Sequence, residues 1–255
     1  MPEIRVHFLP TAVEAAALAG GVTIVIDQLR ASSTICQALA SGAECVVPFL
    51  EVDEAVAAAN AFGCERSLLG GERHGKIIED FDLGNSPLEY VPDVVNGKRL
   101  FFTTTNGTRA MLHAREAQRT LIGSAVNRRA VAEAVVDAPR VDVLCAGTGG
   151  KETAEDILAA GAIAALVHEL APSGPPIGSH AGTAAALDAW HSVLAAAEVA
   201  SRTPSEQLAI AMRDTPGGKN LLSIGHDYDL EACAQLDSID IVPELKYATG
   251  EIRPA

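Results

Sequence analysis

Aromatic residues are scarce in this 255-residue chain, at 4% of the sequence, although hydrophobic residues together make up 48%. The core must therefore consist mainly of aliphatic side chains and alanine, which favours helices packed on a sheet. Long hydrophobic runs are also missing. The longest, such as residues 159–167, are too short and too rich in alanine and glycine to cross a bilayer, so no membrane segment is predicted.

Basic residues are outnumbered, with 19 Lys and Arg against 33 Asp and Glu and a net charge of −14. This balance argues against a nucleic-acid partner, whose phosphates need a basic surface. An acidic protein that handles an anionic substrate must gather its few cations in one place, and it often adds a metal ion.

The five cysteines form no Cys-x-x-Cys pair, and no cluster of cysteine and histidine suits zinc. Their number is odd, and the first ten residues contain charges and no long apolar core. We therefore expect no signal peptide, and a reducing, cytoplasmic compartment.

Apolar strands followed by polar turns and helices recur along the chain, which is the unit that builds α/β proteins with a mostly parallel sheet. Residues 22–40 and 141–170 are the clearest such units, and their similarity suggests two paired halves. The segment rich in proline and glycine at 171–179 is read as a connector within one domain that spans residues 1–255. A homodimer is compatible with the sequence but is not required by it.

Hydrophobic patterning predicts strands at 4–8, 22–26, 45–50, 100–103, 121–122, 141–145, 239–242 and 244–247. Helices are expected at 12–18, 35–40, 52–62, 110–117, 125–136, 152–170, 183–199, 205–212 and 230–234, with a turn at 216–220.

Residues 70–87, GGERHGKIIEDFDLGNSP, show no hydrophobic periodicity and are predicted to form a loop. Loops of this length within compact domains are usually functional or disordered. Ile77, Ile78 and Phe81 give this segment apolar anchors, which favours an ordered loop over a disordered linker.

Four polar segments, 27–34, 70–87, 103–109 and 147–156, concentrate the unusual chemistry. Three of them follow apolar strands, so in a parallel sheet they would meet at one edge. Each has a structural alternative when taken alone. Ser32 or Ser33 could be an N-cap, Thr-Asn-Gly at 105–107 a simple turn, and Asp156 a complement to the helix dipole.

Together these segments supply carboxylates, guanidinium groups, hydroxyls and glycine amides. Oxygen ligands suit a hard cation such as Mg²⁺, which commonly bridges a protein to a substrate phosphate. Arginines suit phosphate, carboxylate or sulfonate groups.

The motifs IVIDQLRASSTI, GGERHGKIIEDFDLGNSPLEY, TTTNGTRA and LCAGTGGKETAEDILAAGAI follow one another over about residues 22–167. In this order they resemble the 2-phosphosulfolactate phosphatase family. The resemblance implies a three-layer α/β/α fold and Mg²⁺-dependent hydrolysis of 2-phospho-3-sulfolactate to 3-sulfolactate and phosphate. That step lies on the route to coenzyme M in methanogens, although the pathway does not transfer with the fold. Gln28, where the family usually has an aliphatic residue, and the acidic pair Glu79–Asp80 depart from the pattern.

We therefore hypothesise an active site for a small anionic phosphate ester. The candidate catalytic residues are Asp27, Glu72, Arg73 and Asp156, and the candidate Mg²⁺ ligands are Asp27, Glu72, Asp82 and Asp156. The candidate substrate-binding residues are Arg30, Ser32, Ser33, Asn85, Ser86, Thr104, Thr105, Asn106, Arg109, Gly147 and Thr148. Arg30 and Arg73 would clamp the phosphate, and the residues at 104–109 the sulfonate or carboxylate end.

Two chemical routes remain open. Asp27 could attack phosphorus to form an aspartyl-phosphate, or water could attack in line while Asp27 binds the metal. Water is favoured, because Leu29 stands where the Asp-x-Asp nucleophile pattern of the familiar aspartate phosphatases would place a second Asp after Asp27. His74 is a candidate general acid, but a single loop histidine is more often a surface residue.

Two other functions compete with this interpretation. The chain could hydrolyse other 2-hydroxy acid phosphates, such as phospholactate or phosphoglycerate. It could also bind phosphorylated or sulfonated acids without catalysis, although converging carboxylates would then only repel the ligand.

Overall fold

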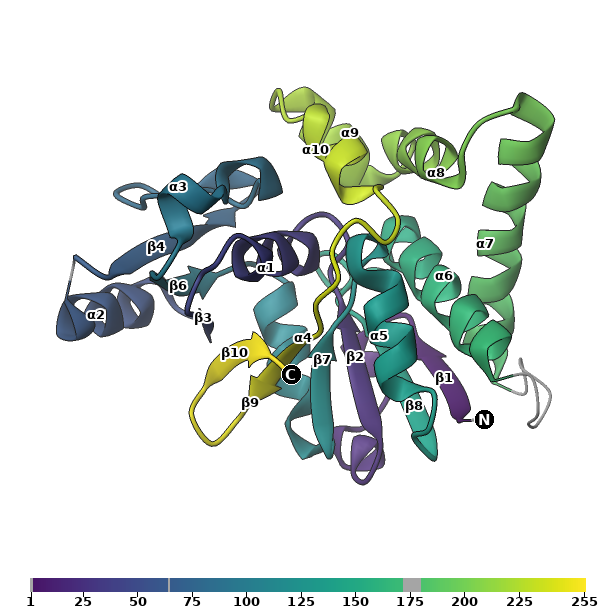
Figure 1. Cartoon of the computed structure of the whole chain (residues 1–255), viewed down its shortest axis with the longest axis horizontal. Helices are drawn as coiled ribbons and strands as arrows, with labels where there is room; N and C mark the ends of the chain where they lie inside the picture. Colours follow the sequence, from purple (N-terminus) through teal and green to yellow (C-terminus); the bar gives the residue numbers. More distant parts are fainter. Residues whose placement is uncertain (1, 64, 172–179) are drawn as a thin grey trace.

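The computed structural model describes residues 2–63, 65–171 and 180–255. Its ten strands form a mixed sheet with helices packed on both faces, which confirms the predicted three-layer α/β/α fold (Figure 1). The strands are β1 Glu3–His7, β2 Val22–Ile26, β3 Cys45–Phe49, β4 Ser67–Arg73, β5 Lys76–Ile77, β6 Arg99–Thr103, β7 Arg119–Ile122, β8 Arg140–Cys145, β9 Pro243–Lys246 and β10 Glu251–Pro254. The predicted connector at 171–179 falls almost entirely outside the described residues.

The sheet consists of two parallel groups, β1-β8-β2-β7 and β3-β6-β4, with the antiparallel pair β9–β10 between them. The pair is joined to the first group through Thr120 and Leu121 of β7, and to the second through Val46 of β3. At the edge, β5 pairs antiparallel with β4. The strands of the two similar units in the sequence, β2 and β8, are parallel neighbours within the first group.

Most helices connect the strands, and the last ones follow one another between β8 and β9. They are α1 Ala31–Ala40, α2 Val52–Phe62, α3 Pro92–Val95, α4 Gly107–His113, α5 Arg128–Val135, α6 Ala154–Leu170, α7 Ala181–Ala200, α8 Pro204–Arg213, α9 Pro216–Ser223 and α10 Tyr228–Cys233. Short 3₁₀ turns are η1 Pro10–Ala12, η2 Ala15–Leu18, η3 Pro87–Glu89, η4 Ala114–Glu116 and η5 Ala125–Asn127.

The continuous apolar run of β2 is explained by burial on both faces. Ile24 and Ile26 pack in one cluster with residues of α5 and α6. Val25, which points to the other face, packs in a second cluster with Ile35 of α1 and Met111 of α4. The central strand therefore needs apolar side chains at successive positions, because helices cover both of its faces.

A third apolar cluster lies outside these layers and contains Trp190, Leu208, Met212, Leu221 and Leu230. It holds α8, α9 and α10 together against α6 and α7. Figure 1 shows α8–α10 above the end of the sheet where β2 leads into α1. The helices at the end of the chain thus cover the region to which the polar segments were predicted to converge.

The interpretation of 70–87 as one loop was partly wrong. Residues 70–73 continue β4, which pairs with β6 in parallel register, and β5 follows after a turn at His74 and Gly75. Glycine is needed at 71, where φ is 141° and an added Cβ would lie 2.0 Å from the carbonyl oxygen of Thr103. Close approach of two backbones explains a strand that lacks the usual apolar pattern.

Three further predictions were wrong near the ends of the chain. The expected turn at 216–220 is the first part of α9, which begins with a Thr215 N-cap and Pro216 at its first position. The segment expected as a strand at 239–242 is irregular, and β10 was missed. Residues 12–18, expected to be one helix, contain parts of η1 and η2.

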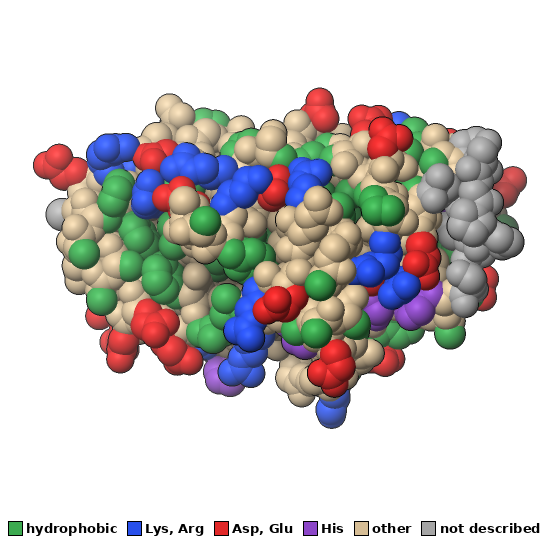
Figure 2. Space-filling model, turned by 90° about the horizontal axis from the view of Figure 1, so that it is seen from below, with side chains coloured by type: hydrophobic (Ala, Val, Ile, Leu, Met, Phe, Trp, Pro, Cys, Tyr) green, Lys and Arg blue, Asp and Glu red, His purple; other side chains and the backbone are tan. Residues whose placement is uncertain are grey.

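The face opposite to α8–α10 carries Lys and Arg side chains next to Asp and Glu (Figure 2). Within the ranges that the structure describes, no helix is long and apolar enough to span a membrane. The four cysteines in these ranges, Cys36, Cys45, Cys145 and Cys233, are free and buried.

Candidate active site

Asp27 lies directly after β2, in the turn that leads into α1. Its backbone N–H donates to Ser32 Oγ at 2.9 Å, and its carbonyl accepts from the Ser32 N–H at 2.9 Å, so the turn is closed on itself. The carboxylate is buried. Gly107 lets the start of α4 lie against it, because a Cβ at that position would come within 2.9 Å of Asp27 Oδ2.

Asp156, in the first turn of α6, joins the ends of β2 and β8. Its Oδ1 accepts from the backbone N–H of Gln28 at 2.8 Å, and its Oδ2 accepts from that of Gly147 at 2.9 Å. Both carboxylate oxygens are thus hydrogen-bonded to loops, a more specific role than complementing a helix dipole.

Glu72, near the end of β4, makes an equivalent bridge in the second group of strands. Its Oε1 accepts from the Thr105 N–H at 2.8 Å and its Oε2 from the Gly75 N–H at 2.7 Å. Asn106 connects the two groups, because its Oδ1 accepts from the Gly149 N–H at 3.2 Å. The four polar segments therefore meet at one edge of the sheet, as their positions after the strands predicted.

Where the four segments meet, several carboxylates are buried and lie close enough to repel one another. Burial, followed by the charges of Asp156 and Glu72, raises the pKa of Asp27 well above its ordinary value, against the opposing Ala31 N–H. Burial also raises the pKa of Asp156 to about 7, although the N–H groups of Gln28 and Gly147 lower it. A cation bound here would relieve this repulsion.

Glu155 belongs to this group but was not predicted. It is 2% exposed, burial raises its pKa, and its charge contributes to the raised pKa of Asp27. Hydrogen bonds from Thr215 and the Gly217 N–H oppose that rise in Glu155, whereas Oε2 has no hydrogen-bond partner among the described residues. Two neighbouring acids at 155 and 156 could have indicated that both belong to the site, but only Asp156 was predicted as a site residue.

The four predicted metal ligands are not placed alike. Asp27, Glu72 and Asp156 are buried and interact electrostatically. Asp82 is exposed, accepts from the Leu69 N–H at 2.8 Å, and is not among the charges that act on Asp27. Over residues 2–63, 65–171 and 180–255, no three His, Cys, Asp or Glu side chains form a group that could hold a metal ion by themselves.

The three predicted arginines differ in what they contact. Arg30 is buried, and it donates to Asp229 Oδ2 at 2.5 Å and to the Gly75 carbonyl at 2.8 Å. Arg73 donates to the carbonyls of Glu72 and Leu50 and to Thr103 Oγ1, and so lies along the backbone. Arg109 is exposed and has no hydrogen bond or ion pair within the described part of the chain.

Most of the predicted substrate-binding hydroxyls are used inside the protein. Ser33 Oγ donates to the Gln28 carbonyl at 3.1 Å, Ser86 Oγ to Asp229 Oδ1 at 2.5 Å, and Thr104 Oγ1 accepts from the Thr108 N–H at 3.3 Å. Gly147 is held by Asp156, and Thr148 is exposed in the next turn. These residues build the loops rather than present free groups.

Two predicted binding residues keep an unpaired atom. The atoms Asn85 Oδ1 and Thr105 Oγ1 are buried and lack a hydrogen-bond partner among the described residues. Buried polar atoms are rarely left in this state unless a ligand, ion or water satisfies them. Together with Asp27 and Arg109 they are the groups best placed to contact a ligand.

Gln28, the departure noted in the sequence, is fully buried and hydrogen-bonded. Its Oε1 accepts from Ser124 Oγ at 3.1 Å and from the Ala125 N–H at 3.0 Å, and its Nε2 donates to the Cys233 carbonyl at 2.7 Å. It therefore ties the β2–α1 turn to α10. His74 is exposed in the β4–β5 turn, in agreement with the surface alternative.

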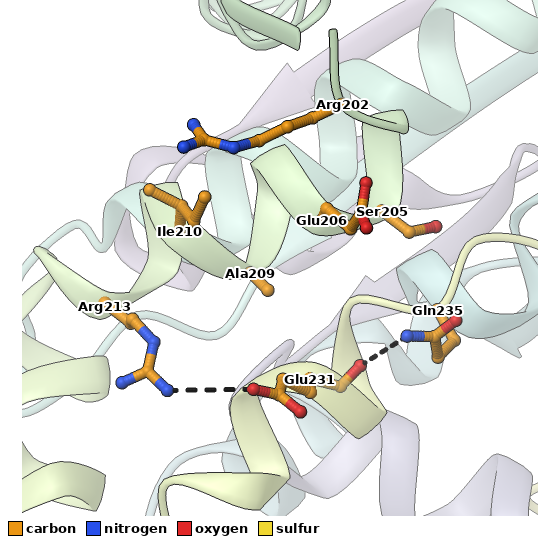
Figure 3. A pocket seen from close by; sticks show the side chains of 8 residues that line it. All are labelled: Arg202, Ser205, Glu206, Ala209, Ile210, Arg213, Glu231 and Gln235. Atoms are coloured by element: carbon orange, nitrogen blue, oxygen red, sulfur yellow. Dashed lines mark hydrogen bonds and ion pairs between the residues drawn. The ribbon is translucent and has the colours of Figure 1, made fainter. Parts of the chain in front are cut away.

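A cleft of about 440 Å³ lies between α8 and α10 (Figure 3). Its lining residues are Arg202, Ser205, Glu206, Ala209, Ile210, Arg213, Glu231 and Gln235. None of them takes part in the hydrogen bonds that join the four segments around Asp27. The cleft is a feature separate from the candidate active site.

Comparison with known proteins gives a consistent result. The family model described as 2-phosphosulpholactate phosphatase matches residues 7–248. A probable 2-phosphosulfolactate phosphatase of Symbiobacterium thermophilum is 41% identical over 230 residues, 89% of this chain and 91% of the relative. Proteins of the same name from Synechococcus sp. (strain CC9605) and Caldanaerobacter subterraneus are 40% and 39% identical, each covering 87% of the relative and 86% and 88% of this chain.

Proposed function

Because the chain belongs to the 2-phosphosulpholactate phosphatase family, whose members are phosphoric monoester hydrolases, we propose that it hydrolyses 2-phospho-3-sulfolactate. The products are 3-sulfolactate and phosphate, and the proposed cofactor is Mg²⁺. The relatives' names support the substrate. The Mg²⁺ requirement rests on the chemistry of the site.

The observation that carries the proposal is the burial of Asp27 where the four polar segments meet. Its carboxylate lies among the charges of Asp156, Glu72 and Glu155. A phosphate ester that also carries a sulfonate and a carboxylate would be repelled by such a group of anions. A divalent cation held here would offset part of this negative charge and would offer the phosphate oxygens of the ester a positive ligand.

The donor set fits Mg²⁺, although no three acidic side chains among the described residues form a complete cage. Magnesium sites for phosphoryl transfer typically use one or two carboxylates, with waters and substrate oxygens as the other ligands. Asp27 and the unpaired Oε2 of Glu155 would hold the ion, while Asp156 and Glu72 hold the loops through backbone N–H groups. When bound, Mg²⁺ would neutralise the charge that develops on the phosphoryl oxygens.

The chain's own polar groups would orient the ester. Thr105 brings an unpaired buried hydroxyl that can donate to the ester, and Arg109 brings a cation without a protein partner among the described residues. The unpaired Oδ1 of Asn85 can only accept, so it would contact the cation or one of its waters. We assign Arg109 to the sulfonate or carboxylate end, since a guanidinium suits either group. Water is the proposed nucleophile, because Asp27 is not followed by a second Asp at position 29, and Asp27 is assigned to the metal.

The test is phosphate release from a panel containing 2-phospho-3-sulfolactate, phospholactate and phosphoglycerate, with Mg²⁺ or with EDTA. We expect the sulfonated ester to have the highest kcat/KM and EDTA to abolish turnover. Preference for another ester would overturn the substrate assignment, and full activity in EDTA the cofactor assignment. Binding of the ester without release of phosphate would identify a non-catalytic binder. A phosphorylated Asp27 peptide in quenched reactions would contradict direct attack by water.

A further inference from the structure

Asp229, on α10, is distant in the sequence from all four polar segments, yet it contacts two of them. Its Oδ2 accepts from Arg30 Nη1 at 2.5 Å and its Oδ1 accepts from Ser86 Oγ at 2.5 Å. The Asp229 side chain is only 2% exposed. A buried carboxylate with a separate partner on each oxygen fixes the distance between those partners.

The two partners belong to loops that carry the groups assigned to ligand binding. Arg30 lies three residues after Asp27, and Ser86 directly follows Asn85, whose Oδ1 is unpaired. Thr34 Oγ1 donates to the Asn85 carbonyl at 2.9 Å, which joins the same two loops a second time. The separation of Asp27 and Asn85 is therefore held by two routes, one direct through Thr34 and one through Arg30, Asp229 and Ser86.

A second contact holds α10 to the same region. Gln28 Nε2 donates to the Cys233 carbonyl at the end of α10, so the β2–α1 turn is attached to this helix at two points. His226 Nδ1 also lies 3.3 Å from Asp229 Oδ2. These contacts come from residues 226–233, which precede β9 in the chain and lie outside the four polar segments.

We propose that Asp229 is a positioning residue of the active site, which acts through Arg30 and Ser86 to hold the Asp27 and Asn85 loops at the separation that the substrate needs. This inference rests on the proposed function. It differs from that function because it concerns α10, which carries none of the predicted catalytic, metal-binding or substrate-binding residues.

The test compares Asp229→Asn, Asp229→Glu and Ser86→Ala with two matched controls. Glu231→Gln changes an exposed carboxylate on the same helix, and Ser192→Ala removes an exposed hydroxyl that donates a single hydrogen bond to a carbonyl. Misplacement of reacting groups by a fraction of an ångström to one ångström costs on the order of tenfold to a hundredfold in rate. We expect Ser86→Ala and both Asp229 variants to lose about tenfold or more in kcat/KM, and the controls to change less than about twofold.

A double-mutant cycle of Asp229 and Ser86 distinguishes the positioning role from a purely structural one. If both residues act through the same contact, Ser86→Ala should have little further effect in the Asp229→Asn background. Kinetics are measured well below the unfolding temperature of each variant. If Asp229→Asn does not fold, the cycle is run with Asp229→Glu. The proposal would be overturned if the two losses in kcat/KM multiplied in the double variant. It would also be overturned by a Ser86→Ala variant as active as Ser192→Ala.

Failure of the proposed function gives a different result. If the wild-type protein releases no phosphate from any ester, that function is wrong whatever the variants do. The same cycle is then measured as the dissociation constant of inorganic phosphate by calorimetry. A wild-type affinity that Ser86→Ala and Asp229→Asn weaken about tenfold, without additivity, supports the positioning role. Unchanged or undetectable binding overturns it.

Discussion

Two acidic clusters in this protein contain the same kinds of side chain in opposite surroundings. Where β3, β6 and β10 meet, Glu44 lies 3.0 Å from Arg99 and 3.2 Å from Arg253, and Glu251 lies 2.9 Å and 2.8 Å from the same two arginines. Hydrogen bonds from Arg99 and Arg253 lower the pKa of Glu44. At the candidate active site, burial and neighbouring acids raise the pKa of Asp27.

The difference shows how each cluster is used. The first is partly exposed and has its cations in the protein, so it contributes to stability. The second is buried, and its carboxylates are bound by backbone N–H groups that fix their positions but carry no full charge. Under the proposed function, such an arrangement would take its cation from outside the protein, at some cost to stability.

The largest effect is expected from Asp27→Asn. It removes the central carboxylate, so kcat/KM should fall by at least about a hundredfold, the scale seen when a charge-stabilising group is lost. The free energy of unfolding should rise by about 1 kcal/mol, because one buried charge is removed from the group. Glu44→Gln should show the opposite pattern, with activity kept and stability lost. Phosphate release and urea unfolding measure both quantities, and the comparison fails if both variants behave alike.

Mg²⁺ should stabilise one cluster and not the other. In wild-type protein, free Mg²⁺ at about one hundred times its dissociation constant should raise the free energy of unfolding by about 2.7 kcal/mol. Asp27→Asn should lose most of this gain, and Glu44→Gln should keep it. Thermal unfolding with Mg²⁺ or EDTA measures the shift. An equal shift in Asp27→Asn would mean that the ion binds elsewhere.

The two clusters should respond to pH with opposite signs. Asp156, with a pKa raised from 3.8 to about 7, and Asp27 bind more protons in the folded than in the unfolded protein between these values. Their contribution to stability therefore falls as pH rises from about 4 to 7. In EDTA, the stability advantage of Asp27→Asn over wild type should grow across this window, by about 1–2 kcal/mol. A constant difference would contradict the assignment.

The smallest effect is expected at the paired cluster. Because the pKa of Glu44 is lowered, its stabilisation is present above the unfolded value of 4.5 and is lost as pH falls through the folded pKa. Glu44→Gln should therefore cost about 1 kcal/mol near pH 7 and almost nothing near pH 3. Glu3→Gln, which breaks a more exposed pair with Arg5, is the matched control and should stay within about 0.5 kcal/mol.

Patterns that depend on local chemistry were predicted well. The bounds of β2 and α2 agree with the expected ranges 22–26 and 52–62, because an apolar run and an amphipathic pattern are each contained in a few consecutive residues. The convergence of the four polar segments followed from their places after strands. The extension of β4 through Gly70 and Gly71 was missed, because it results from contact with β6 and not from the hydrophobicity of those residues.

The roles of individual polar residues were less predictable. Ser33, Ser86 and Arg30 had the chemistry of phosphate ligands, but their donors are used by Gln28 and Asp229. Glu155 was not predicted as a site residue, yet it keeps an unpaired oxygen. Only the positions of all partners decide which polar groups remain available.

The sequence by itself determined the α/β architecture, the family and the four polar segments of the candidate site, since these follow from periodicity and from motifs of neighbouring residues. Tertiary structure decided which carboxylates hold loops and which can face a ligand, and it brought Asp229 to Arg30 and Ser86. The physical reason is that a hydrogen bond or a pKa shift depends on distance and burial in space, and residues up to 209 positions apart in the chain supply both.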